Sequence, residues 1–149
     1  MPKTEIKVVR HGRHEMSRHT ANADGEVYAG QGVVESDGKS TVTAGTDGTS
    51  RLCVAIDDRE RGMELGDLYE DEDHVTYVAV SGGGLTLLLA DGETVDPSAE
   101  SRVVFDENGF LVPYDGGAHD ESEVVGFVDE DEAIEADGNF EPVDVEVAS

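Results

Sequence analysis

Short apolar runs that end in Asp-Gly or Asn-Gly pairs constrain this chain more than any other feature. The sequence holds six Asp-Gly pairs and one Asn-Gly pair, and they punctuate short runs rich in Val, Leu, Tyr and Phe. β-branched and aromatic residues pack well on a pleated sheet, and Asp-Gly or Asn-Gly accept the positive φ of tight turns. The pattern therefore predicts an all-β fold: a compact antiparallel β-barrel or sandwich of short strands with an N-terminal arm.

The same pattern locates the individual strands. Alternation of polar and apolar residues supports the last strand in particular. Gly82–Gly84 is predicted to form the tip of a hairpin, and Asn108 with Gly109 the tip of another. The expected strands are Ile6–Arg10, Glu26–Tyr28, Gly32–Glu35, Ser40–Ala44, Arg51–Ile56, Val75–Val80, Leu85–Ala90, Arg102–Asp106, Phe110–Tyr114, Val124–Val128 and Val143–Val147.

The charge of the chain indicates the environment to which its surface is adapted. It carries 35 Asp and Glu residues against 10 Lys and Arg, a net charge of −25. Few aromatics and many acids are typical of disorder, but here the acids occupy turns between apolar runs, so we expect a folded domain. At about 1 M salt the Debye length is about 3 Å, and repulsion between surface carboxylates is strongly screened. We therefore expect a halophilic source; the alternative is an ordinary acidic protein.

The first twenty residues differ in charge from the rest of the chain. They hold five of the ten basic residues against two acids, whereas the remainder holds 33 acids against five basic residues. This asymmetry predicts a basic N-terminal arm or first strand, 1–20, and a single β domain, 21–149. The alternative for 1–20 is a strand followed by a solvated polar loop. The candidate contact residues of the arm are Lys7, Arg10, His11, Arg13, His14 and Arg18.

An acidic protein surface is the partner that such an arm fits best, because arginine and carboxylate groups form strong pairs at short range. Direct nucleic-acid binding is disfavoured, because the acidic body repels phosphates and phosphate binding falls steeply as salt rises. We expect that deleting 1–20, or changing Arg10, Arg13 and Arg18 to Glu, weakens attachment to this partner surface and leaves the β domain folded.

The sequence contains no motif with a catalytic mechanism. Gly-x-Ser-x-Gly, His-Glu-x-x-His, Cys-x-x-Cys and the Walker loop do not occur. The segment Gly30–Gly32 lacks the helix and lysine of a phosphate loop. The pair His11 and His14, and the acidic stretch Asp71–His74, are better explained as solvated or interfacial groups than as metal ligands. We therefore predict a protein that is not an enzyme and has no catalytic residue, metal or cofactor.

Other single features fit a protein that folds around one core. Cys53 lies in an apolar run and is expected to pack as a small hydrophobe. No run reaches the roughly eighteen apolar residues of a membrane helix, so no membrane partner is expected, and the N-terminus lacks an apolar signal region, which predicts synthesis in the cytoplasm. The aromatic residues expected in the core or an interface are Tyr69, Tyr77, Phe105, Phe110, Tyr114 and Phe127.

Three features of residues 51–149 occur together: Gly66–Tyr69 ahead of a strand, a strand–Asn-Gly–strand unit around Asn108, and the late strand Val124–Val128. In these features the chain resembles the small capsid decoration, or cement, proteins of tailed viruses. It departs from the family where Val128 and Asp129 replace the usual small residue. The resemblance implies a virion structural protein, commonly a homotrimer, that binds the outer surface of an icosahedral head and stabilises the major capsid protein lattice. With the acidity, it implies a tailed virus of halophilic archaea.

Two other functions stay open at this point. A capsid turret or receptor-binding spike would share the fold and differ in its place on the virion. A soluble haloarchaeal β-barrel enzyme or ligand-binding module should instead show titratable groups that converge beside glycine loops. Co-sedimentation with purified virus particles would discriminate between the virion and the soluble alternatives.

Overall fold

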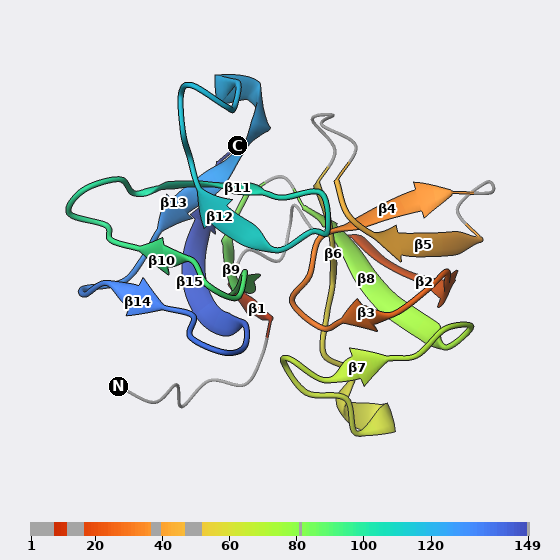
Figure 1. The fold of residues 1–149 in the computed structure, drawn as a ribbon. Helices are drawn as coiled ribbons and strands as arrows, with labels where there is room; N and C mark the ends of the chain where they lie inside the picture. The colour runs from red at the N-terminus through yellow and green to blue at the C-terminus, as the bar shows by residue number, and fades with distance from the viewer. Residues whose placement is uncertain (1–7, 12–16, 37–39, 47–51, 81, 149) are drawn as a thin grey trace.

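The computed structural model describes residues 8–11, 17–36, 40–46, 52–80 and 82–148, and most of its regular structure is β-strand (Figure 1). Its helical segments within these ranges are two single 3₁₀ turns, η1 at Arg59–Arg61 and η2 at Glu121–Glu123. The strands form two main sheets that lie side by side. The predicted all-β fold class is therefore confirmed.

The larger sheet closes into a barrel. Its order is β1-β9-β12-β11-β13-β15, and a further pairing of β15 with β9 completes a ring (left in Figure 1). Because β15 occupies one edge of β9, β1 and β12 share the other edge. A small sheet of β10 and β14 lies beside the barrel. The bounds are β1 Val9–His11, β9 Gly84–Leu89, β10 Thr94–Val95, β11 Arg102–Phe105, β12 Leu111–Pro113, β13 Val124–Val128, β14 Ile134–Glu135 and β15 Glu141–Val147.

The second sheet has five strands in the order β4-β5-β2-β8-β6 (right in Figure 1). A bridge between Gly32 and Val54 brings β6 next to the residue that precedes β4, so this sheet is bent towards closure. A short pair, β3 with β7, lies at its lower side in the view. The bounds are β2 Ser17–Ala23, β3 Val27–Tyr28, β4 Val33–Ser36, β5 Thr41–Ala44, β6 Leu52–Ala55, β7 Leu68–Tyr69 and β8 His74–Val80.

Strand pairing agrees with the sequence at one predicted hairpin and not at the other. Strands β11 and β12 are antiparallel neighbours, and Gly109 in the turn between them has a φ of 81°. The predicted hairpin over Gly82–Gly84 is wrong, because β8 pairs with β2 and β6 whereas β9 belongs to the barrel. Gly82 and Gly83 have positive φ, which lets the chain leave one sheet and enter the other. Among the described strands two pairings, β9 with β12 and β2 with β5, are parallel.

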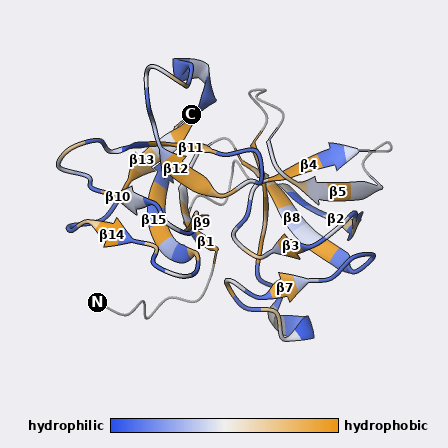
Figure 2. Ribbon diagram, in the orientation of Figure 1, coloured by the Kyte–Doolittle hydropathy of each residue, from blue (hydrophilic) through white to orange (hydrophobic). Residues whose placement is uncertain are grey.

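A single hydrophobic core joins the two sheets. It includes Leu87 and Val103 of the barrel and Val54 and Tyr77 of the second sheet, all of them 0–1% exposed. Hydrophobic residues lie on the strands and hydrophilic residues on most of the loops between them (Figure 2). Cys53 is buried in this core, which confirms its prediction as a packed apolar group.

The segment Gly30–Gly32 forms the junction between the sheets. The Gly32 amide donates to the Gly109 carbonyl at 2.8 Å, and the buried Gln31 side chain donates from Nε2 to the Asn108 carbonyl at 2.5 Å. A Cβ on Gly32 would lie 2.8 Å from the Phe105 ring, so only glycine lets the two sheets approach this closely. The segment that superficially resembles a phosphate loop is therefore a packed joint.

The first twenty residues contribute strands to both sheets. The expected strand Ile6–Arg10 overlaps β1, Val9–His11, at Val9 and Arg10, and residues 1–7 lie outside the described ranges. Strand β2 was not predicted, and it pairs with β8 from Ser17 to Asn22. Deletion of 1–20 would remove β1 and the first half of β2. The expectation that the β domain stays folded without residues 1–20 therefore does not hold, and we expect their deletion to destabilise it.

Candidate functional site

The structure describes some of the predicted contact residues and not others. Lys7, Arg13 and His14 lie outside the described residues. His11 ends β1, and only its backbone position is described. Arg10 and Arg18 are described with their side chains, and they occupy two different environments. Their predicted role in binding a capsid stays a prediction.

Arg10 is held against the outside of the barrel by carboxylates and backbone carbonyls. Its guanidinium lies 3.7 Å from Asp144, 3.5 Å from Glu146 and 3.5 Å from Asp129. Nη2 also donates to the carbonyl of Val145 at 3.2 Å, and Nε donates to that of Leu85 at 3.4 Å. The side chain is only 16% exposed. The acidic surface that fits this arginine is therefore part of its own chain: Arg10 fastens β1 across β9 to β15.

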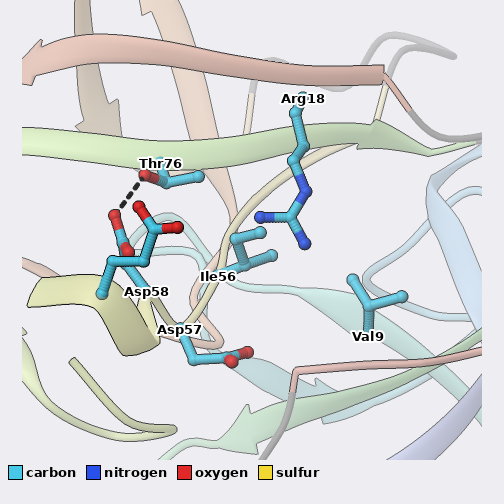
Figure 3. Close-up of a pocket in the computed structure, with 7 residues that line it drawn as sticks. Val9, Arg18, Ile56, Asp57, Asp58 and Thr76 are labelled. Atoms are coloured by element: carbon cyan, nitrogen blue, oxygen red, sulfur yellow. Dashed lines mark hydrogen bonds between the residues drawn. The ribbon is translucent and has the colours of Figure 1, made fainter. Parts of the chain in front are cut away.

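Arg18 lines a hollow between the second sheet and β1. The hollow has a volume of about 470 Å³, and its other lining residues are Val9, Ile56, Asp57, Asp58, Glu60 and Thr76. Arg18 extends from β2 over Ile56, while Asp57 and Asp58 lie on the opposite side of the space (Figure 3). Asp57 also accepts a hydrogen bond from the Val8 amide at 2.8 Å. The hollow thus combines an apolar floor with one guanidinium and three carboxylates.

The chemistry of this hollow is that of fixed charges. The Asp58 carboxylate accepts hydrogen bonds from Arg61 at 2.8 Å and Thr76 at 3.1 Å. The Arg61 bond lowers the pKa of Asp58 below its ordinary value. A carboxylate held ionised in this way is a poor general acid and a weak base near neutral pH. The hollow can bind charged or polar groups, but its side chains are not arranged as a nucleophile with an adjacent base.

A second arginine cluster lies on β11, separated from Arg10 by strands β13 and β15 on the same outer face of the barrel. Arg102 donates two hydrogen bonds of 2.8 Å to the Glu100 carboxylate, and its guanidinium lies 4.3 Å from the centre of the Tyr114 ring. These bonds lower the pKa of Glu100 to about 2 and raise the pKa of Arg102. The two residues form a bidentate ion pair at the start of β11, and both members stay charged at neutral pH.

The acidic residues before β8 accept hydrogen bonds from backbone amides. Asp71 accepts a hydrogen bond from the Gly25 amide at 2.8 Å, and Asp73 accepts one from the Glu70 amide at 2.8 Å. The Asp73 bond closes the turn before β8, as short acidic side chains commonly do, whereas the Asp71 bond ties this loop to the distant turn at Gly25. Within the described ranges no group of three or more His, Cys, Asp or Glu side chains is placed to hold a metal ion. No helix in the same ranges is both long and apolar enough to span a membrane.

Phe127 is exposed, unlike several of the aromatic residues that were predicted for the core or an interface. Tyr69, Tyr77 and Phe105 are buried, whereas the Phe127 side chain on β13 is 48% exposed. Its neighbours across the strands are Arg102 on β11 and Glu146 on β15. Sequence reasoning assigned Phe127 to a core or interface without choosing between them; the structure places it outside the barrel, between the two arginine clusters.

Comparison with known proteins yields a match of structure. No protein-family model and no curated protein matches the sequence. Among solved structures, the chain is similar to the head fiber gp8.5 N base of bacteriophage phi29, with a TM-score of 0.56 and 18% sequence identity. The match covers 89% of this chain and 94% of that one. The two chains therefore share a fold over nearly their whole lengths.

Proposed function

We propose that the chain is a virion structural protein attached to the outside of a tailed-virus head. The observation that carries the proposal is the fold that it shares with the phi29 head fiber base over nearly all of both chains. The sequence resemblance of residues 51–149 to capsid decoration proteins points to the same class independently. The partner on the head would be the major capsid protein, and the chain would act there as a homotrimer.

The closed barrel and the shared core support a structural role for the protein. The barrel closes on itself and so presents few free strand edges, and one core joins both sheets. The hollow beside Arg18 is lined by charged groups, and its Asp58 is held ionised by Arg61. We therefore extend the proposal to a protein without enzymatic activity, and a measured turnover by the purified chain would contradict it.

Two more specific roles fit a protein on the outside of a virus head. The first is cement: the protein would bind across neighbouring capsid subunits and stabilise the lattice. The second is the base of a projecting fibre or spike. The structural similarity to the base of the phi29 head fiber favours this role. Heating heads with and without the protein separates the roles, since a cement protein raises the temperature at which heads break and a fibre base leaves it unchanged.

The acidity supports the further proposal of a virus whose host lives in concentrated salt. At a net charge of −25, self-repulsion opposes the compact state until salt screens it. We expect unfolding by urea to need more denaturant at about 1 M salt than at about 0.1 M, where the Debye length is about three times longer. Equal stability in both would contradict a halophilic origin and leave the virion role standing.

The main experiment is co-sedimentation. Purified chain is added to virus heads that lack it, and head fractions from a density gradient are probed for the protein. We expect saturable binding to heads. An unrelated acidic protein of similar charge serves as the control for non-specific association. Absence of the chain from the head fractions, at low and at high salt, would overturn the proposed function.

A further inference from the structure

Phe127 is an exposed aromatic side chain on a rigid support. At 48% it is the most exposed large hydrophobic side chain in the described part of the chain. It is the penultimate residue of β13, at a position that is paired on both sides, with β11 and with β15. Its strand neighbours Val125 and Val128 are buried in the core. An aromatic group held this firmly loses little conformational freedom when a partner covers it.

Two arginine–carboxylate clusters flank this ring. On one side the opposite residue is Arg102, which is fixed by Glu100 and by the Tyr114 ring. On the other side the opposite residue is Glu146, which contacts Arg10 at 3.5 Å. Phenylalanine, tyrosine and arginine are enriched at interfaces, and tyrosine and arginine are among the residues that most often carry the binding energy. We propose that Phe127 and these two clusters form the surface by which the chain grips its partner on the virus head.

The charges of this surface specify the chemistry of the partner. Asp129 and Glu146 keep 54% and 44% of their side chains exposed while they contact Arg10, so a partner can reach their carboxylates. The chain as a whole carries −25. The complementary surface is therefore a shallow apolar pocket that takes the phenyl ring and is rimmed by arginine or lysine. Such complementarity guides docking and excludes acidic partners.

A second copy of the chain is a poor occupant of the same surface. In a two-fold contact the same patch faces itself, so the exposed carboxylates of one copy would meet those of the other. In the heterologous contact of a trimer the patch would face another part of a chain that itself carries −25. Like charges placed opposite each other oppose association. The basic partner on the head is therefore favoured, and this inference rests on the proposed function.

The test uses the full chain and heads that lack it. Dissociation constants are measured by titration of labelled chain against heads for wild type, F127S, F127L and H74S. His74 is an exposed ring on β8 in the second sheet, so H74S controls for loss of a ring elsewhere. We expect F127S to bind roughly 30-fold more weakly, the loss expected of a central aromatic anchor, and F127L to lose less. H74S should bind as wild type does.

Further measurements keep the result interpretable. Thermal unfolding followed by circular dichroism should show that F127S still folds cooperatively, with a midpoint lowered only slightly, since about half of the ring is exposed. D129N should bind several-fold more weakly at low salt and nearly normally at high salt, because it removes an exposed charge at the rim.

The outcomes separate the inference from the function on which it rests. If wild type binds heads and F127S binds equally well, the surface assignment falls and the proposed function stands. If wild type does not bind heads, both fall. If light scattering shows that F127S loses an oligomeric state of the wild type, the surface joins copies of the chain, and the assignment to a basic partner is overturned.

Discussion

Replacing Arg10 by methionine tests whether the N-terminal strand is fastened by its guanidinium. Methionine keeps most of the apolar stem and removes the charge. The change takes away three carboxylate contacts of 3.5–3.7 Å and two bonds to backbone carbonyls. It also leaves Asp129, Asp144 and Glu146 close together without the guanidinium between them. We expect a clear loss of stability, not the small effect of an ordinary surface arginine.

The magnitude follows from the burial of the groups. Breaking a fully buried ion pair costs about 3–5 kcal/mol, whereas an exposed pair is worth about 0–1 kcal/mol. Arg10 lies between these limits, because its side chain is 16% exposed and those of the three carboxylates are 23–54% exposed. We expect R10M to lower the free energy of unfolding by about 2–3 kcal/mol, or to lower the unfolding temperature by about 4–12 °C.

Arg61 provides the matched control. Its Nε lies 2.8 Å from Asp58, closer than any contact of Arg10, but its side chain is 40% exposed. We therefore expect R61M to cost less than about 1 kcal/mol. Urea unfolding is followed by circular dichroism at about 0.1 M and about 1 M salt, where the Debye length falls from about 10 Å to about 3 Å. High salt should remove about half of the R10M loss. A loss no greater than that of R61M, or one independent of salt, would refute the reasoning.

Three further predictions concern the joint, an ion pair and the core. Gly109 has a φ of 81°, and a Cβ there would collide with the Gly32 carbonyl oxygen, whereas Gly92 has a φ of 86° and open space. G109A should therefore cost about 3 kcal/mol and G92A about 1 kcal/mol, as measured by urea unfolding. Because the pKa of Glu100 falls from 4.5 to about 2 on folding, its contribution is present above pH 4.5 and lost as pH falls towards 2. The unfolding temperature of E100Q should therefore fall less steeply over that range than that of wild type; parallel curves would contradict the ion pair. Cys53 is 5% exposed, so a thiol reagent should label it only at the rate at which the chain opens, and fast labelling of the native protein would contradict its burial.

The turn signals predicted most strands, because Asp-Gly and Asn-Gly require a particular backbone. Asn108 with Gly109 marks a real hairpin for this reason. A run of glycines such as Gly82–Gly84 carries no such requirement, since it allows the chain to return or to continue into another sheet, and here it continues. Strand β2 escaped prediction because Ser17–Ala23 is mostly polar; among residues 18–23 it buries only two small side chains, Ala21 and Ala23, at 4% and 3% exposure.

The two faces of β13 explain why the exposed ring could not be recognised from its own strand. Val124–Val128 contains only apolar side chains and a glycine, so alternation does not show which residues point outward. The pairing of β13 with β11 also shifts register between Val103 and Val104. The information lies in β15, where valines alternate with acids and the valines at 143 and 145 are fully buried. Because Phe127 pairs with Glu146, the acidic face of β15 places the ring outside the barrel. The alternation of one strand thus determines the exposed face of its neighbour, but only once the pairing is known, and pairing between distant strands is what a single sequence does not contain.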